Sequence, residues 1–227
     1  MQCLSTESMI TKIKKIDYYK ESIKEYKEIK TLKTNEKPKL LLHVCCGACS
    51  CYPLVFLSNL FDITIFFSNS NIYPKNEFEK RLLAVNNYKK EIEKLFGESI
   101  NVVVDDYDYD EFRKDLLPFK DLPEGQERCK ICISKRMKRL FEFASKNNFE
   151  YVTTIMSISR NKDAQFINKI GLDFSKSFAN VRYFVSDFKK NDGQDIGIDI
   201  SKKYNVYRQN YCGCEFSRFI KNNFSVI

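Results

Sequence analysis

Apolar and polar residues recur along the first part of the chain at the spacing of a helix. Between residues 8 and 32 the apolar positions lie three or four residues apart, with lysines and glutamates between them: Met9, Ile13, Ile16, Ile23, Tyr26 and Ile29. This spacing predicts an amphipathic helix or helix pair that packs on the main body. Because residues 33 to 39 form a polar linker, we expect a helical extension and linker over 1–39 and the working domain over 40–227.

From residue 40 onwards, short apolar runs alternate with longer amphipathic segments. The short runs predict buried strands at 40–44, 63–67, 101–104 and 151–154. The longer segments predict helices at 52–60, 75–96, 130–148 and 162–170. Strands that alternate with helices indicate a three-layer α/β fold with a mainly parallel sheet.

Residues that can carry chemistry follow each predicted strand. In chain order they are Cys45 and Cys46, Asn69 and Asn71, the aspartate-rich segment 105–108, and the segment 157–160. In open parallel sheets, ligands bind beyond the carboxyl ends of the strands, where the strand order reverses. A further pair, Cys129 and Cys132, opens a long predicted helix, whose positive N-terminal dipole favours thiolates. We therefore expect these two cysteine groups, together with the pair Cys212 and Cys214, to converge on one edge of the sheet.

Cysteine is the most informative residue type in the composition. The chain has nine, and six of them form three tight groups: Cys45-Cys46, Cys129-x-x-Cys132 and Cys212-Gly213-Cys214. The N-terminus lacks the charged and apolar pattern of an export signal, and no run approaches the roughly 20 apolar residues of a membrane span. We therefore expect a cytoplasmic protein with no membrane segment, whose thiols stay reduced. Thiolates gathered from distant segments of such a protein most often hold iron or zinc.

The spacing of the cysteines bears on the kind of metal centre. A Cys-x-x-Cys pair at a helix start chelates one metal or cluster easily, whereas adjacent cysteines are awkward around a single ion and suggest a larger centre, or two. A 4Fe-4S cluster takes four thiolates, which can come from Cys45, Cys46, Cys129 and Cys132. The remaining pair, Cys212 and Cys214, is then left for a second metal or for electron transfer as a dithiol. A zinc site built from any four of the six remains the alternative.

Several other types of metal site and active site are excluded, because the chain lacks residues that they require. The Cys-x3-Cys-x2-Cys pattern of radical S-adenosylmethionine enzymes begins at Cys45 and Cys49, but its third position is Tyr52. The bacterial ferredoxin run is also absent. The only histidine is His43, which excludes a Ser-His-Asp triad and a histidine-rich metal site. Since His43 lies within the first strand, we expect a neutral, buried imidazole with a backbone partner.

The formal net charge of +8 favours a polyanionic partner such as nucleic acid. Four arginines are candidates for phosphate contacts or for stacking on a splayed base: Arg136, Arg160, Arg182 and Arg208.

Five segments, in order, closely resemble the QueH-type epoxyqueuosine reductases. They are Leu-Leu-Leu-His-Val-Cys-Cys-Gly-Ala-Cys (40–49), Asn-Ser-Asn-Ile-Tyr-Pro (69–74), Arg-Cys-Lys-Ile-Cys (128–132), Asp-Phe-Lys-Lys (187–190) and Tyr-Arg-Gln-Asn-Tyr-Cys-Gly-Cys (207–214). The resemblance covers about 40 to 218 and leaves out the N-terminal helical segment.

The resemblance implies a nucleotide-hydrolase-like fold and a cobalamin-independent reductase. Such an enzyme performs the last step of queuosine formation, the two-electron reductive deoxygenation of epoxyqueuosine in tRNA, and needs a low-potential electron donor. It further implies that Cys45, Cys46, Cys129 and Cys132 bind a 4Fe-4S cluster, that Cys212 and Cys214 are redox-active, and that a second iron lies beside the cluster. We expect the ligands of this iron among Cys49, Asp108, Cys212 and Cys214. As the acid that protonates the departing epoxide oxygen, the candidates are Asp108 and Asp187.

The chain departs from the usual family pattern at several positions. Ala48 stands where many relatives have proline, Ser70 interrupts Asn-Pro-Asn, and the loop expected at 191–200 lacks the usual basic residues. Cys51 is an additional thiol without an assigned role, and Cys3 lies outside the matched region.

Two other functions compete with the reductase. One is a zinc-stabilised nucleic-acid-binding module without catalysis. The other is an ATP-dependent tRNA thiolase or hydrolase on the same kind of fold, which would need a Ser-Gly-Gly-x-Asp-Ser type of phosphate loop after the first strand. That position reads Cys-Cys-Gly-Ala-Cys-Ser, so ATP use is disfavoured.

Overall fold

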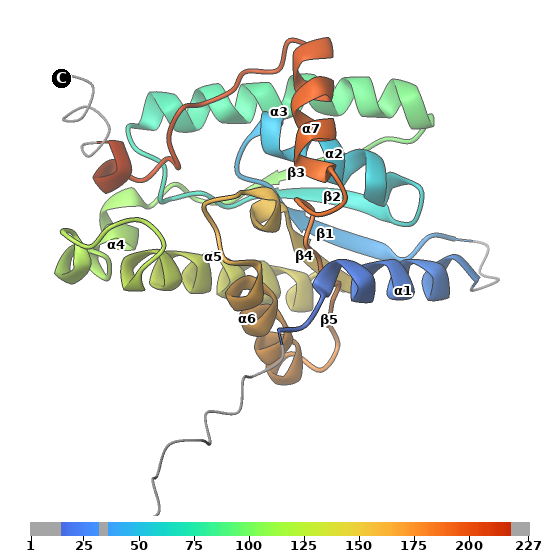
Figure 1. Ribbon diagram of the computed structural model, residues 1–227, viewed down its shortest axis with the longest axis horizontal. Helices are drawn as coiled ribbons and strands as arrows, with labels where there is room; N and C mark the ends of the chain where they lie inside the picture. The colour runs from blue at the N-terminus through green and yellow to red at the C-terminus, as the bar shows by residue number, and fades with distance from the viewer. Residues whose placement is uncertain (1–14, 32–35, 219–227) are drawn as a thin grey trace, which may run out of the picture.

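The described part of the chain folds around a five-stranded parallel sheet. The computed structural model describes residues 15–31 and 36–218, and its sheet has the order β3-β2-β1-β4-β5 (Figure 1). The strands are β1 (Lys39–His43), β2 (Asp62–Phe67), β3 (Asn101–Val104), β4 (Tyr151–Thr154) and β5 (Arg182–Tyr183). All neighbouring pairs are parallel, and the strand order reverses between β1 and β4. The predicted three-layer α/β fold is therefore confirmed.

Successive residues of β1 point to opposite faces of the sheet and build two cores. Leu40 and Leu42 join the core under α2 (Gly47–Ser58), α3 (Lys75–Phe96) and α7 (Gly193–Lys203). Leu41 joins the core under α5 (Glu127–Lys146) and α6 (Ala164–Ser177). Figure 1 shows these two groups of helices on opposite sides of the sheet. Since both faces are covered, β4 is buried over its whole length and β1 over all but its first residue, as expected for a parallel sheet.

The N-terminal helix α1 (Tyr18–Thr31) packs on the rest of the molecule. Tyr18 belongs to the core beneath α5 and α6, whereas Ile29 belongs to the opposite core. Gln165 at the start of α6 donates from Nε2 to the carbonyl of Ile16, 2.7 Å away. The earlier part of the predicted helical segment, including Met9 and Ile13, lies outside the described residues.

The structure corrects several predicted boundaries. The helix predicted at 52–60 begins at Gly47, five residues earlier, and α6 continues to Ser177 rather than to residue 170. The short elements α4 (Tyr109–Lys114), η1 (Leu117–Phe119), η2 (Ile155–Ile158) and β5 were not predicted. Each is too short for hydrophobic periodicity to reveal it.

The segment 191–200 was expected to be a loop, and this was wrong, because it forms most of α7. Two glycines let this helix lie close to α2. A Cβ on Gly193 would stand 2.2 Å from the carbonyl oxygen of Phe188 and 2.7 Å from the ring of Tyr52, and Gly197 also packs against Tyr52. Glycine lowers intrinsic helix propensity, so the helix depends on tertiary packing that local sequence does not reveal.

Candidate metal centre

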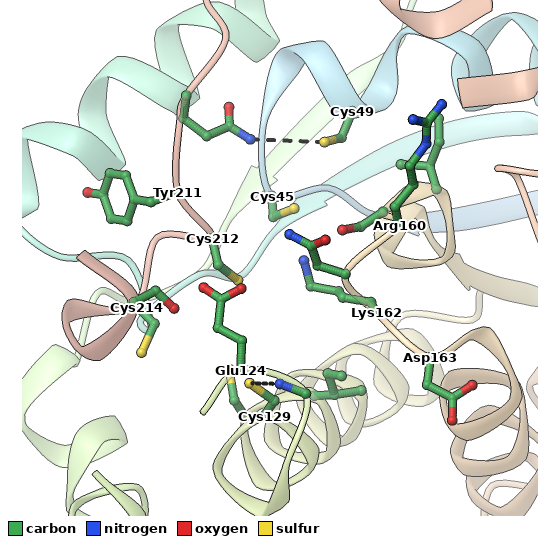
Figure 2. A pocket seen from close by; sticks show the side chains of 18 of the residues that line it. Cys45, Cys49, Glu124, Cys129, Arg160, Lys162, Asp163, Tyr211, Cys212 and Cys214 are labelled. Carbon is green, nitrogen blue, oxygen red and sulfur yellow. Dashed lines mark hydrogen bonds between the residues drawn. The ribbon is translucent and has the colours of Figure 1, made fainter. Parts of the chain in front are cut away.

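The three cysteine groups converge on one cavity beyond the carboxyl ends of β1 and β4. The cavity has a volume of about 360 Å³. Six cysteines are among its lining residues: Cys45, Cys49, Cys129, Cys132, Cys212 and Cys214. Figure 2 shows the side chains of Cys45, Cys129 and Cys212 around the same space. The predicted convergence on one edge of the sheet is therefore confirmed.

The first group sits in the turn between β1 and α2. Cys45 lines the cavity, whereas Cys46 is fully buried at the N-cap position of α2. Asn69, which follows β2, holds this turn by donating from Nδ2 to the carbonyl of Val44 at 2.8 Å. Gly47 lets α2 approach α3, since a Cβ there would lie 3.0 Å from the main chain of Ala84.

The second group occupies the first turns of α5. Cys129, Cys132 and Arg136 are spaced three and four residues apart and all line the cavity, as one face of a helix requires. Arg128, directly before Cys129, is almost fully buried, and its Nη1 donates to the main-chain carbonyls of Phe119, Lys120 and Leu122. It thereby fastens the preceding loop to the start of α5.

The third group is held against α3 by a buried ion pair. Arg81 has no solvent exposure, and its Nε lies 2.7 Å from the carboxylate of Glu77. The same guanidinium donates to the carbonyls of Tyr211 and Cys212 at 3.2 and 3.1 Å. Gly213 has a φ of 113°, and a Cβ on it would stand 3.0 Å from Nη1 of Arg81, so this tight turn needs glycine.

Several of the thiols hold their protons tightly because they are buried and donate hydrogen bonds to one another. Donation to Cys46 and burial raise the pKa of Cys45. The hydrogen bond from Cys45 lowers the pKa of Cys46, but donation to Cys49 and burial outweigh it and raise the pKa to about 12. Burial also raises the pKa of Cys214 to about 12, while the hydrogen bond from Cys46 lowers that of Cys49. A metal that binds here must displace these protons.

Two cations face the thiols without a carboxylate partner among the described residues. Arg136 is 2% exposed, and its Nε has no hydrogen-bond partner in the described part of the chain. Lys162, in the loop after β4, points into the same space in Figure 2. Burial lowers its pKa, but the nearby Cys212 and Cys45 sulfurs outweigh that effect and raise it. An anionic group in the cavity would balance these two charges, and a metal bound by several thiolates is such a group.

The donors surround the cavity without forming a finished ligand set. Over residues 15–31 and 36–218, no three His, Cys, Asp or Glu side chains are grouped closely enough to hold an ion as they stand. The residue types nevertheless fit iron or zinc, because soft thiolates are their usual ligands.

The two candidate aspartates do not line the cavity. Asp108 is the N-cap residue of α4 and lies 2.5 Å from Nη2 of Arg139. Burial raises the pKa of Asp108, but hydrogen bonds from Arg139 and Ser70 lower it overall, so its carboxylate is ionised. Asp187 is buried beside Lys189, with Oδ1 2.8 Å from Nζ.

Other cavity residues were not predicted from the sequence. They include Arg81, Glu124, Lys162, Asp163, Gln194 and Gln209. Gln209 stands inside the motif at 207–214, and Lys162 lies in the segment that follows the fourth strand. Their places in the sequence were therefore the only clue that they belong to the site. Of the four candidate arginines, Arg136, Arg160 and Arg208 line the cavity and Arg182 does not.

Two remaining predictions concern His43 and Cys51. His43 is buried, with Nε2 3.2 Å from the carbonyl of Ser68 and Nδ1 2.9 Å from the hydroxyl of Thr154. The predicted backbone partner is confirmed, and burial lowers the pKa of His43 to about 3. Cys51 points into the core and donates to the carbonyl of Gly47, away from the cavity.

No helix among the described residues combines the length and the apolar character that crossing a membrane requires.

Comparison with known proteins gives one consistent family. The model of the family "Epoxyqueuosine reductase QueH" matches residues 40–219. A protein of that name from Streptococcus pyogenes serotype M1 is 35% identical over 82% of this chain and 72% of its own length. Those from Staphylococcus epidermidis and Thermotoga maritima are 37% and 35% identical, over 80% and 78% of this chain and 77% and 89% of their own lengths.

Proposed function

The chain belongs to the epoxyqueuosine reductase QueH family, and from that membership we propose that it reduces epoxyqueuosine in tRNA to queuosine. The reaction removes the epoxide oxygen: two C–O bonds break, a carbon–carbon double bond forms, and two electrons and two protons release the oxygen as water. The electrons come from a low-potential donor.

The observation that carries this proposal is the convergence of six cysteines from three distant segments around a buried, unmatched guanidinium. Arg136 lies one turn after Cys132, on the face of α5 that lines the cavity. A buried cation without a carboxylate is costly unless an anionic centre balances it. This arrangement favours a metal centre bound by several thiolates over free structural thiols, and the family membership favours a redox-active metal.

We assign the ligands of this centre as the resemblance implies. Cys45, Cys46, Cys129 and Cys132 are the proposed ligands of the 4Fe-4S cluster. Cys49, Cys212 and Cys214 are the proposed donors for an adjacent iron or, for the last two, a redox-active pair. Asp108 is the weaker fourth candidate, since it is already paired with Arg139. When bound, such a centre supplies electrons and Lewis acidity toward the epoxide oxygen.

The chain itself must supply a proton to the departing oxygen. Lys162 is better placed for this role than Asp108 or Asp187, because it lines the cavity and they do not. Its ammonium group stays protonated beside the sulfurs, and it projects toward the space between Cys45 and Cys212 (Figure 2). We therefore propose Nζ of Lys162 as the acid.

The substrate enters where further cations border the cavity. Arg160 and Arg208 are both exposed and line it, so we propose that they contact tRNA phosphates beside the modified nucleotide. We further propose that residues 40–227 form the reductase domain and 1–39 an accessory extension.

Mass spectrometry of tRNA tests the proposed activity. The protein, reconstituted anaerobically with iron and sulfide, is incubated with epoxyqueuosine-containing tRNA and a low-potential reductant. We expect the epoxide to lose one oxygen atom with the wild type, but not with Cys129→Ala, and far more slowly with Lys162→Met and Lys162→Arg, because neither side chain readily gives up a proton. Persistence of the epoxide with the wild type, at the level seen with Cys129→Ala, would reject the proposal.

A further inference from the structure

The side-chain amide of Gln209 lies against the sulfurs of two cysteines. Its Nε2 is 3.0 Å from Sγ of Cys46 and 4.0 Å from Sγ of Cys49, within the range of N–H donation to sulfur. The second of these contacts is drawn to Cys49 in Figure 2. Above, Cys46 was assigned to the cluster and Cys49 to the adjacent iron. A single amide with two N–H groups therefore reaches a ligand of each proposed centre.

The orientation of this amide follows from its surroundings. The oxygen, Oε1, is buried and has no hydrogen-bond partner among the described residues. If the amide were reversed, that oxygen would face electron-rich sulfur and the N–H groups would lose their acceptors. The N–H groups therefore point to the sulfurs.

No other described group offers Cys46 a lasting hydrogen bond. Cys46 is the N-cap residue of α2, yet its sulfur accepts no bond from the first backbone N–H groups of that helix. Its other partners are the thiols of Cys45 and Cys49, which must lose their protons if they bind metal. Gln209 would then remain the donor.

Residues on both sides of Gln209 are anchored to helix α3. Two residues before it, the hydroxyl of Tyr207 donates to Glu77 at 2.8 Å. Two residues after it, the carbonyl of Tyr211 accepts from Arg81 at 3.2 Å. Both anchors belong to the buried Glu77–Arg81 pair of α3, so the amide is positioned before any metal arrives.

We propose that Gln209 is a positioning residue that raises the reduction potential of the metal centre by donating N–H bonds to the sulfurs of Cys46 and Cys49. Donation to a thiolate withdraws negative charge from the sulfur, which stabilises the more electron-rich, reduced state. The inference rests on the proposed function, because it needs a redox metal at these cysteines.

The test is a redox titration of the full chain reconstituted anaerobically with ferrous iron and sulfide. Gln209→Met keeps the length of the side chain but removes the donors, and Gln209→Glu replaces them with a carboxylate oxygen. Gln194→Met is the matched control, since Gln194 lines the same cavity without a sulfur contact in the described structure.

We expect a more negative midpoint potential for Gln209→Met, a larger shift in the same direction for Gln209→Glu, and no shift for Gln194→Met. Iron content and circular dichroism identify the variants that remain loaded and folded. A wild-type potential in either loaded Gln209 variant overturns the inference and leaves the reductase proposal intact. Failure of the wild type to bind iron would instead remove the proposed function itself.

Discussion

The guanidinium of Arg81 donates to the main-chain carbonyl of Cys212, 3.1 Å away, and so ties the last cysteine group to helix α3. The two residues are 131 positions apart in the chain. Because Arg81 also pairs with the buried carboxylate of Glu77, one side chain connects the folding of α3 to the placement of Cys212 and Cys214.

Arg81→Met is expected to destabilise the protein by about 3–5 kcal/mol, because it leaves the buried carboxylate of Glu77 without its cation. Urea unfolding measures this change. Lys94→Met removes an exposed ion pair with Glu91 on the same helix and is expected to cost no more than about 1 kcal/mol. Equal free energies of unfolding for the two variants would contradict the role given to Arg81.

Cys49→Ala and Cys51→Ala provide a matched pair on helix α2. Cys49 lines the cavity, whereas Cys51 is completely buried in the core beside Gly47. We expect Cys49→Ala to lose iron and activity, and Cys51→Ala to keep both at a stability cost of about 1 kcal/mol. Iron analysis after anaerobic reconstitution compares the iron content of the two variants. If Cys51→Ala lost iron and Cys49→Ala did not, Cys51 rather than Cys49 would be the iron ligand.

Arg136→Met is expected to have opposite effects on the metal-free and the loaded protein. Without metal, the variant no longer buries an unmatched charge, so its free energy of unfolding should rise by about 1 kcal/mol or more. With metal, the lost counter-charge should weaken iron retention, whereas Arg136→Lys keeps it in part. Thermal melts with and without iron measure both effects. A metal-free Arg136→Met protein that is less stable than the wild type would contradict this account.

His43 makes stability depend on pH in a defined window. Burial lowers its pKa to about 3, so between pH about 6.5 and 3 the unfolded chain binds a proton that the folded chain does not. The free energy of unfolding should therefore fall as pH falls through this window, by up to about 1.4 kcal/mol per pH unit from this group. His43→Gln should lack that component. If the free energy of unfolding of the wild type and of His43→Gln changed with pH in the same way, His43 would not titrate as described.

The sequence allowed the central architecture and the convergence of the cysteines to be predicted because both rest on local patterns. The apolar run at 40–44 and the amphipathic run at 75–96 follow their own periodicities. Cys45 and Cys46 follow a predicted strand, and Cys129 and Cys132 open a predicted helix. The ends of parallel strands meet at one edge, so convergence could be inferred without coordinates.

The missed features depend on contacts between distant segments. Helix α7 has two glycines and forms against Tyr52 of α2, so its local sequence suggested a loop. The roles of Arg81 and Gln209 come from contacts with residues more than 100 positions away. Asp108 was a candidate acid because it follows a predicted strand. In the structure its carboxylate forms an ion pair with Arg139 of α5.

The most direct test of the central claim is the metal content of the wild-type protein purified under anaerobic conditions. Iron, acid-labile sulfide and visible absorbance are measured on the same sample. We predict a brown protein with about four sulfides and four to five irons per chain, whose absorbance bleaches on reduction. A colourless protein with about one zinc and no sulfide would contradict the reductase centre and favour a structural metal site.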